Sequence, residues 1–140
     1  MDTLSGLRRL LAAILLVGMS GTFAELLLVR HVEDALQLVP VVLLGCGIAG
    51  VVWHAWTRSR ASVAALQLVM ALFIGAGLLG IYLHFAANVE FQKETDPSLA
   101  GAALVWRALQ ATVPPSLAPG VMLQLGLVGL AYTYRRSVET

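Results

Sequence analysis

Four long runs of apolar residues occupy most of this sequence, and they restrict its fold more than any other feature. A helix needs roughly 20 mostly apolar residues to cross a membrane. We predict spanning helices at about 10–29, 38–57, 61–86 and 117–134. Pro40 and Pro119 then fall in the first turns of the second and fourth spans, where the missing N–H is harmless. The predicted fold is an all-α integral membrane bundle of four transmembrane helices, forming a single domain over residues 1–140.

The composition agrees with a membrane environment. Hydrophobic residues make up 59% of the chain and charged residues 12%, whereas a soluble domain carries about 25% charged residues. A net charge of +1 argues against binding to nucleic acid, which requires a basic face. Cys46 is the only cysteine, so a disulfide within one chain and dithiol redox chemistry are both excluded.

Basic residues flank the apolar runs unequally. If all four segments cross, one side carries six of the nine lysines and arginines: Arg8, Arg9, Arg58, Arg60, Arg135 and Arg136. The other side carries Arg30, Lys93 and Arg107, together with Glu33, Asp34, Glu90, Glu94 and Asp96. Because basic flanks stay in the cytoplasm, we predict a multi-pass protein of the cell (inner) membrane with cytoplasmic N- and C-termini.

The N-terminal segment allows a second interpretation. "LRRLLAAILLVGMSGTFA" has a basic start, an apolar stretch and small residues near Ala24, like a cleavable signal peptide ending at residue 24. The apolar run continues through "LLLV" after Ala24, which favours a retained span. Cleavage would leave three spans with the same topology.

Residues 87–115 form the longest loop between the predicted spans. Asp96 and Pro97 suit the N-cap and the first position of a helix at about 97–112. Its apolar residues recur at helical spacing: Leu99, Ala102, Ala103, Trp106, Leu109 and Val113. We expect this short amphipathic helix to lie on the outer membrane surface. The alternative is a cap over the outer end of the bundle.

The second apolar run contains Gly45-x-Gly47-x-x-Gly50, the spacing of a dinucleotide-binding fingerprint. That fingerprint needs a strand, a turn and a helix in a soluble βαβ unit, with an acidic residue about 20 positions later. Here the run stays apolar to Trp56, and the next charge is Arg58. We therefore interpret these glycines as helix-packing positions.

Two segments, "GIAGVVWH" and "GLLGIYLH", share the pattern Gly-x-x-Gly-x-x-x-His. This spacing places each set on one helix face, so both histidines are expected to point toward neighbouring helices. The two sets are Gly47, Gly50 and His54, and Gly77, Gly80 and His84. The match allows an inverted repeat. Because the two spans run in opposite directions, His54 and His84 lie too far apart to ligate one metal or haem.

Glu25 is the acidic residue placed inside a predicted span. It follows Gly18, Gly21 and Thr22 at steps of three or four, so we expect these packing glycines and Glu25 to face the bundle. An ionised carboxylate buried in hydrocarbon costs on the order of 3 kcal/mol or more. Glu25 is therefore expected to be protonated or to meet a partner. The candidate partners near its depth are Arg30, His84, Asn88, Thr22 and Gln124.

Three functional hypotheses use the polar residues at the outer end. In the first, a divalent metal binds to some of these residues: Glu25, His31, Glu33, Asp34, His84 and Glu90. In the second, Glu25 and His84 couple proton or solute movement, with Asn88 and Gln124 nearby. In the third, His31 and His84 hold a b-type haem. The simpler alternative is that Glu25 pairs with Arg30 and that the other polar residues belong to solvated turns.

No nucleophile–base set is visible, so an enzyme is not expected, and no cofactor is identified. The predicted partners are the lipid bilayer and either a second copy or another membrane protein. The leading functional prediction is a non-catalytic subunit or accessory protein of a membrane complex. The alternative is a proton- or metal-linked small transporter with an outer-face site around Glu25 and His84.

Overall fold

The structure, a computed structural model of the chain, describes residues 3–134 as five helices without a strand among them. The helices are α1 (Thr3–Leu28), α2 (Ala35–Thr57), α3 (Arg60–Thr95), α4 (Gly101–Leu109) and α5 (Gly120–Thr133). The prediction of an all-α fold is confirmed. Arg135 and Arg136, which entered the orientation prediction, lie outside the described residues.

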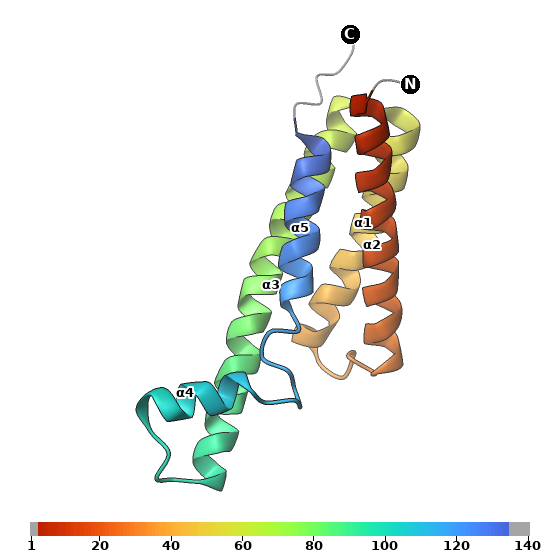
Figure 1. Cartoon of the computed structure of the whole chain (residues 1–140). Helices are drawn as coiled ribbons and strands as arrows, with labels where there is room; N and C mark the ends of the chain where they lie inside the picture. The colour runs from red at the N-terminus through yellow and green to blue at the C-terminus, as the bar shows by residue number, and fades with distance from the viewer. Residues whose placement is uncertain (1–2, 135–140) are drawn as a thin grey trace.

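Four of the helices form a bundle in which each packs on two neighbours. α1 contacts α2 and α5, and α3 contacts the same two helices from the other side. The start of α1, the α2–α3 turn and the end of α5 lie together, at what we call the terminal end (Figure 1). The α1–α2 turn and the loop before α5 lie at the opposite end, which we call the hairpin end (Figure 1).

α3 is much longer than its neighbours. Its 36 residues correspond to about 54 Å at the α-helical rise, so its last turns project beyond the α1–α2 turn (Figure 1). α4 lies across this projecting part and packs on it through Leu104 and Ala108, which are both buried. Residues 110–119, the α4–α5 loop, then return to the bundle.

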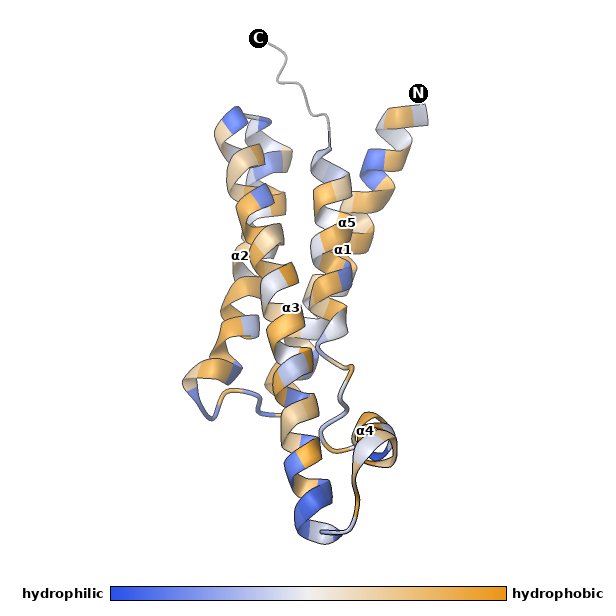
Figure 2. Cartoon of the chain, turned by 90° about the vertical axis from the view of Figure 1, so that its left-hand side faces the viewer, coloured by the Kyte–Doolittle hydropathy of each residue, from blue (hydrophilic) through white to orange (hydrophobic). Residues whose placement is uncertain are grey.

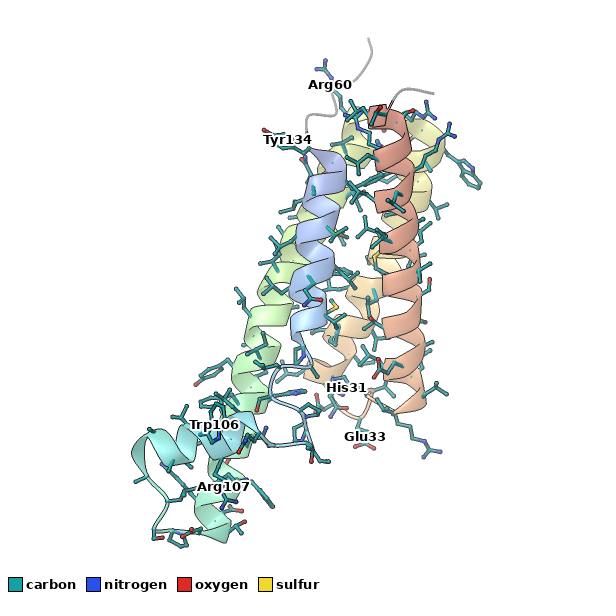
Figure 3. The ribbon with its side chains drawn as sticks, in the orientation of Figure 1. His31, Glu33, Arg60, Trp106, Arg107 and Tyr134 are labelled. Atoms are coloured by element: carbon teal, nitrogen blue, oxygen red, sulfur yellow. The ribbon has the colours of Figure 1, made fainter. Side chains whose placement is uncertain are left out.

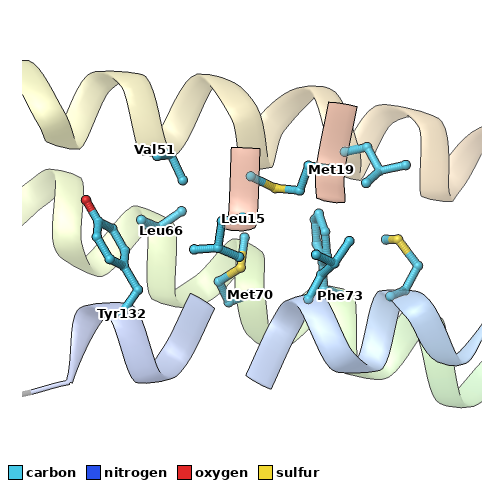
Figure 4. Close-up of a cluster of buried hydrophobic side chains, with 10 residues drawn as sticks. Leu15, Met19, Val51, Leu66, Met70, Phe73 and Tyr132 are labelled. Carbon is cyan, nitrogen blue, oxygen red and sulfur yellow. The ribbon is translucent and has the colours of Figure 1, made fainter. Parts of the chain in front are cut away.

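The interior of the bundle is apolar and comes from all four helices. Figure 4 shows Leu15 and Met19 of α1 packed against Phe73 and Met70 of α3, with Val51 of α2 nearby. The other buried members of this cluster are Leu44, Leu66, Met122, Leu125 and Tyr132. Close packing of large side chains across facing helices is the arrangement expected of a well-filled core.

Glycines allow α3 and α5 to approach most closely. A Cβ atom added at Gly77 would lie 2.6 Å from the backbone nitrogen of Leu123, and one at Gly126 would lie 2.7 Å from the carbonyl oxygen of Met70. Of the six predicted packing glycines, five would meet a neighbouring side chain or backbone: Gly18, Gly47, Gly50, Gly77 and Gly80. Gly21 borders open space instead.

Three helices, α1, α2 and α3, are long and apolar enough to cross a membrane. Figure 2 shows their apolar residues over the middle of the bundle, with hydrophilic residues at the α2–α3 turn and at the tip of α3. α5 is apolar but has only 14 residues. The structure therefore supports three spans by length and composition, and the count of four stays a prediction.

Several predicted boundaries are corrected. α2 begins at Ala35, so Pro40 falls in its second turn rather than its first. α3 continues to Thr95, nine residues past the predicted end at residue 86, because Phe85–Thr95 has helix-forming residues and no Gly or Pro before Pro97. The fourth apolar segment becomes helical only at Gly120, after Pro119.

The predicted helix at about 97–112 is shorter, spanning Gly101–Leu109. Asp96 ends α3 instead of starting α4, because its carboxylate accepts hydrogen bonds from the backbone N–H and the hydroxyl of Ser98, at 3.1 and 2.6 Å. Such a turn competes with a helix start. α4 begins after Ala100, which has an extended backbone.

Candidate functional site

Three side chains at the hairpin end hold the α4–α5 loop against α3. Asn88 donates from Nδ2 to the carbonyl oxygen of Pro114 and to Oγ of Ser116, both at 2.8 Å. Ser116 donates in turn to the carbonyl oxygen of Ala108 at 2.7 Å. Nδ1 of His84 lies 3.0 Å from the carbonyl oxygen of Pro115. We call His84, Asn88 and Ser116 the loop clamp.

The loop clamp supplies side-chain donors to three backbone carbonyls, of which Pro115 and Ala108 also accept from the backbone N–H groups of Ala118 and Ala111. A carbonyl can only accept, so Nδ1 of His84 must carry the proton in its contact with Pro115. Asn88 and Ser116 are both buried, with 2% and 1% of their surface exposed. A carbonyl that loses its donor on burial costs about 1–3 kcal/mol, so the part-buried bond from Asn88 to the Pro114 carbonyl stabilises this non-helical segment.

The depth of the loop clamp follows from the helical rise. Counted from Arg60 at 1.5 Å per residue, His84 lies about 36 Å along α3 and Asn88 about 42 Å. A bilayer has a hydrocarbon core of about 30 Å and a total thickness of about 40–45 Å. If Arg60 marks one membrane face, the loop clamp lies in the headgroup region of the other.

The prediction that Glu25 faces the bundle is wrong. Glu25 and Gly21 are exposed, because α1 turns the opposite face, with Leu15 and Met19, toward the core. Glu25 does follow Gly18 at helical spacing. Gly18 itself, however, lies only at the edge of the buried face, where it contacts Leu125. The carboxylate of Glu25 has no hydrogen-bond or ion-pair partner among residues 3–134, although its backbone carbonyl accepts from the N–H of Val29.

The other predicted outer-end residues are dispersed. Glu33, Asp34, Glu90 and Gln124 are exposed, and His31 and Thr22 are half-buried. Figure 3 shows His31 and Glu33 at the α1–α2 turn, away from Arg60 and Tyr134 at the terminal end. Within residues 3–134, no three His, Cys, Asp or Glu side chains come close enough to hold a metal ion. The metal hypothesis therefore gains no support from the geometry.

His54 is buried at the terminal end, as the glycine spacing predicted. Its Nδ1 lies 2.9 Å from Oγ of Ser62, which donates to the carbonyl oxygen of Ser59 at 2.8 Å. The imidazole meets the ring of Tyr132 edge to face, with 6.0 Å between centroids. His54 thus joins α2, α3 and α5, and this arrangement indicates a packing role.

Two structural residues were not identified from the sequence. Nothing in the sequence around Ser116 signals its contact with Asn88. Asp34 was interpreted as part of a solvated turn, yet its carboxylate accepts from the backbone N–H of Gln37 at 2.9 Å and caps α2. Oε1 of Gln37 accepts from the N–H of Glu33. An acidic residue three positions before Gln is the spacing of a capping box, a signal that was available.

An open pocket of about 380 Å³ lies between the projecting part of α3 and the α4–α5 loop. Its lining residues are Asn88, Phe91, Gln92, Arg107, Gln110, Ala111, Thr112 and Val113. This set contains one cation and several neutral hydrogen-bonding groups, but no acidic residue or histidine.

Over residues 3–134, the fold and these contacts define the class: a small helical protein with three helices long and apolar enough to cross a membrane, and a polar clamp at one end of its bundle. Comparison with known proteins gives no more specific assignment. No protein-family model, curated protein or solved structure shows a significant match to this chain.

Proposed function

We propose that this protein is a non-catalytic subunit or accessory protein of a membrane complex. It crosses the cell (inner) membrane four times, through α1, α2, α3 and α5, with both chain ends in the cytoplasm. α4 lies on the outer membrane surface. Its role is to contribute helical surface to an assembly rather than to bind or transform a small molecule.

The composition of the bundle core is the observation that carries this proposal. The buried polar side chains of the described residues lie at the two ends of the bundle: His54, Ser62 and Thr133 at the terminal end, and Asn88 and Ser116 at the hairpin end. The cluster between them consists of Leu, Met, Val and Phe, with Tyr132 at one end. A proton or solute pathway needs polar or ionisable groups across the membrane interior, and this core offers none.

A fourth crossing by α5 requires help from the α4–α5 loop. The 14 residues of α5 extend about 21 Å, which is less than the hydrocarbon core of about 30 Å. Non-helical backbone is tolerated at membrane depth where protein covers it. Pro119 packs on Gly80, and the loop clamp supplies donors to the carbonyl oxygens of Pro114 and Pro115. α5 and this loop together are long enough to cross.

The placement of α4 supports a position on the membrane surface. α4 crosses the projecting part of α3 at the hairpin end (Figure 1). Ser116 bonds both to the Ala108 carbonyl of α4 and to Asn88, so the end of α4 lies at the depth of Asn88. Val105, Trp106 and Leu109 are exposed although apolar. Exposed apolar and Trp side chains at headgroup depth are typical of a helix that lies in the interface.

The alternative, a transporter that uses Glu25 and His84, has less support. Glu25 lies on the outward face of α1, and His84 is engaged with the Pro115 carbonyl. α1 and α3 occupy opposite corners of the bundle, each packed mainly on α2 and α5. The two side chains therefore lack the shared interior position that proton coupling requires.

Cysteine accessibility tests the topology. In a Cys46→Ser background, Thr95→Cys should react with an impermeant thiol reagent in intact cells, and Ser59→Cys should react only after permeabilisation. The reverse pattern would overturn the orientation. Reaction of both in intact cells would show that α3 does not cross the membrane and would overturn the proposed topology.

Two further measurements test the proposed role. The protein purified from its membranes in mild detergent should have a mass greater than one chain by light scattering. Reconstituted in proteoliposomes, it should carry no proton flux above protein-free vesicles. A proton flux that Glu25→Gln abolishes would contradict the subunit role and establish the transporter.

A further inference from the structure

The outward face of α1 carries a second apolar seam, separate from the face that fills the bundle. The residues of this seam are Leu10, Ile14, Val17, Gly21, Ala24 and Leu28, at steps of four and three, and all six are exposed. Val17 is 74% exposed and Leu28 83% exposed, because they lie opposite the buried Leu15 and Met19. This alternating spacing is the a/d pattern by which two helices pack in a left-handed pair.

From this seam we infer that α1 is the interface of a parallel homodimer, formed with a second copy of this chain. The inference rests on the proposed function, because it names the partner within the membrane assembly. The two copies insert with the same topology, so a two-fold axis along the membrane normal brings equal depths of the two seams together. Helices in a membrane associate through close packing and interhelical hydrogen bonds. Gly21, which borders open space, permits such an approach.

Two polar residues beside the seam specify a second copy rather than lipid. If Gly21 occupies position a, Ser20 takes the preceding g position and Glu25 the following e position. In a parallel pair, each g position faces the e position of the next heptad on the partner, and these flanking residues form the cross-helix contacts. Ser20 of each copy therefore faces Glu25 of the other, and both side chains are exposed in the single chain.

Hydrogen-bond chemistry makes the Ser20–Glu25 contact complementary. A hydroxyl donates to a carboxylate and also accepts from a protonated carboxyl group, so the pair forms in either state of Glu25. The symmetry doubles the contact, because each copy supplies one Ser20 and one Glu25. Facing lipid alone, Glu25 would have no donor or acceptor within the described chain, and an unsatisfied carboxyl group in hydrocarbon is costly.

Disulfide cross-linking in membranes tests the interface. In a Cys46→Ser background, Val17→Cys is oxidised with copper phenanthroline in isolated membranes. Leu68→Cys on α3 is the matched control, since Leu68 is 63% exposed and lies eight residues from Arg60, as Val17 lies eight residues from Arg9. We expect covalent dimer from Val17→Cys in at least about tenfold excess over Leu68→Cys. Equal yields at the two positions would overturn the inference.

Substitutions at the polar contact test its specificity. Ser20→Ala or Glu25→Leu should lower the dimer fraction of the detergent-purified protein several-fold, and Glu25→Gln should retain the dimer because an amide still bonds to a hydroxyl. A dimer fraction unchanged by Glu25→Leu would overturn the Ser20–Glu25 contact. If the protein co-purifies with a different membrane protein and Val17→Cys gives no dimer, the homodimer fails while the proposed subunit role stands.

Discussion

Asn88 and Ser116, 28 positions apart in the sequence, are joined by a buried hydrogen bond of 2.8 Å that fixes the α4–α5 loop to α3. The same Asn88 nitrogen also reaches the Pro114 carbonyl, and Ser116 continues the chain of donors to Ala108. Three elements, α3, α4 and the loop, are therefore held by one connected set of hydrogen bonds. Pro114 and Pro115 have no N–H groups to donate, so at these two residues the loop can only accept hydrogen bonds, and side chains of α3 supply the donors.

Replacing Asn88 should destabilise the protein more than its small size suggests. Asn88→Ala leaves the Pro114 carbonyl without its donor, and the expected loss of unfolding free energy is about 1–3 kcal/mol. Asn88→Asp keeps the shape but, when ionised, places a carboxylate beside that carbonyl, so it should cost at least as much. The measurement is reversible unfolding in detergent, compared with wild type.

The pH dependence of Asn88→Asp provides a check. Protonation restores one O–H donor, so the stability of this variant relative to wild type should increase as the pH falls from about 8 to about 5. Asn88→Gln is a control that retains the amide but places it one methylene farther from the backbone. A variant Asn88→Asp that is as stable as wild type at neutral pH would contradict the role of Asn88 as a donor.

The helices could be predicted from local signals, but their contacts could not. The apolar run of α1 and the glycine pattern before His54 both identify features that the structure contains, because composition and helical spacing act within one element. Glu25 was assigned to the wrong face because α1 is apolar around most of its circumference. On such a helix, the spacing of residues shows which of them share a face but not which face packs against the neighbouring helices.

The loop clamp illustrates a second limit of the sequence. Asn88 and His84 were singled out as polar residues near the outer end, but as partners of Glu25. Their actual acceptors are backbone carbonyls of Pro114 and Pro115, which are absent from any list of chemically notable side chains. Finding this contact requires knowing that α5 begins only at Gly120, so that a non-helical segment must be bound to α3.

His84→Ala should have a smaller effect than Asn88→Ala. His84 is half-buried and makes a single hydrogen bond to the Pro115 carbonyl, at 3.0 Å. Removing it should cost about 0.5–1.5 kcal/mol, the usual net value of one hydrogen bond. Thermal unfolding of both variants in the same detergent gives the comparison. A larger loss of stability for His84→Ala than for Asn88→Ala would contradict a purely structural His84. So would a loss of stability in chelator-treated wild type that added Zn²⁺ restores.

Asp96 at the tip of α3 should titrate below its ordinary range. The hydroxyl of Ser98 and its backbone N–H both donate to the carboxylate, and these bonds hold the pKa of Asp96 below its ordinary range. Since the folded pKa is depressed, the turn is stabilised above the unfolded pKa, and this contribution is lost as the pH falls through the folded value. The carboxyl carbon shift of Asp96 in an NMR titration measures it.

Ser98 variants separate the causes of that shift. Ser98→Ala removes the first and largest cause and should raise the pKa of Asp96 toward its ordinary value, whereas Ser98→Thr keeps the hydroxyl and should leave the pKa low. An identical titration of Asp96 in wild type and Ser98→Ala would show that the hydroxyl has no part in the shift.

Two glycines in α3 should respond differently to the same substitution. In Gly77→Ala the new methyl group meets the backbone nitrogen of Leu123 at 2.6 Å and the Pro119 carbonyl oxygen at 3.1 Å. Backbone atoms of α5 cannot move aside independently, so the helices must separate, and overpacking of this kind costs about 1–3 kcal/mol. Gly75, two residues earlier on the exposed face, has nothing within 4 Å. Gly75→Ala should therefore leave stability unchanged or raise it by up to about 1 kcal/mol through helix propensity. Unfolding of the two variants side by side measures the difference, and equal stabilities would contradict the close contact between α3 and α5 at Gly77.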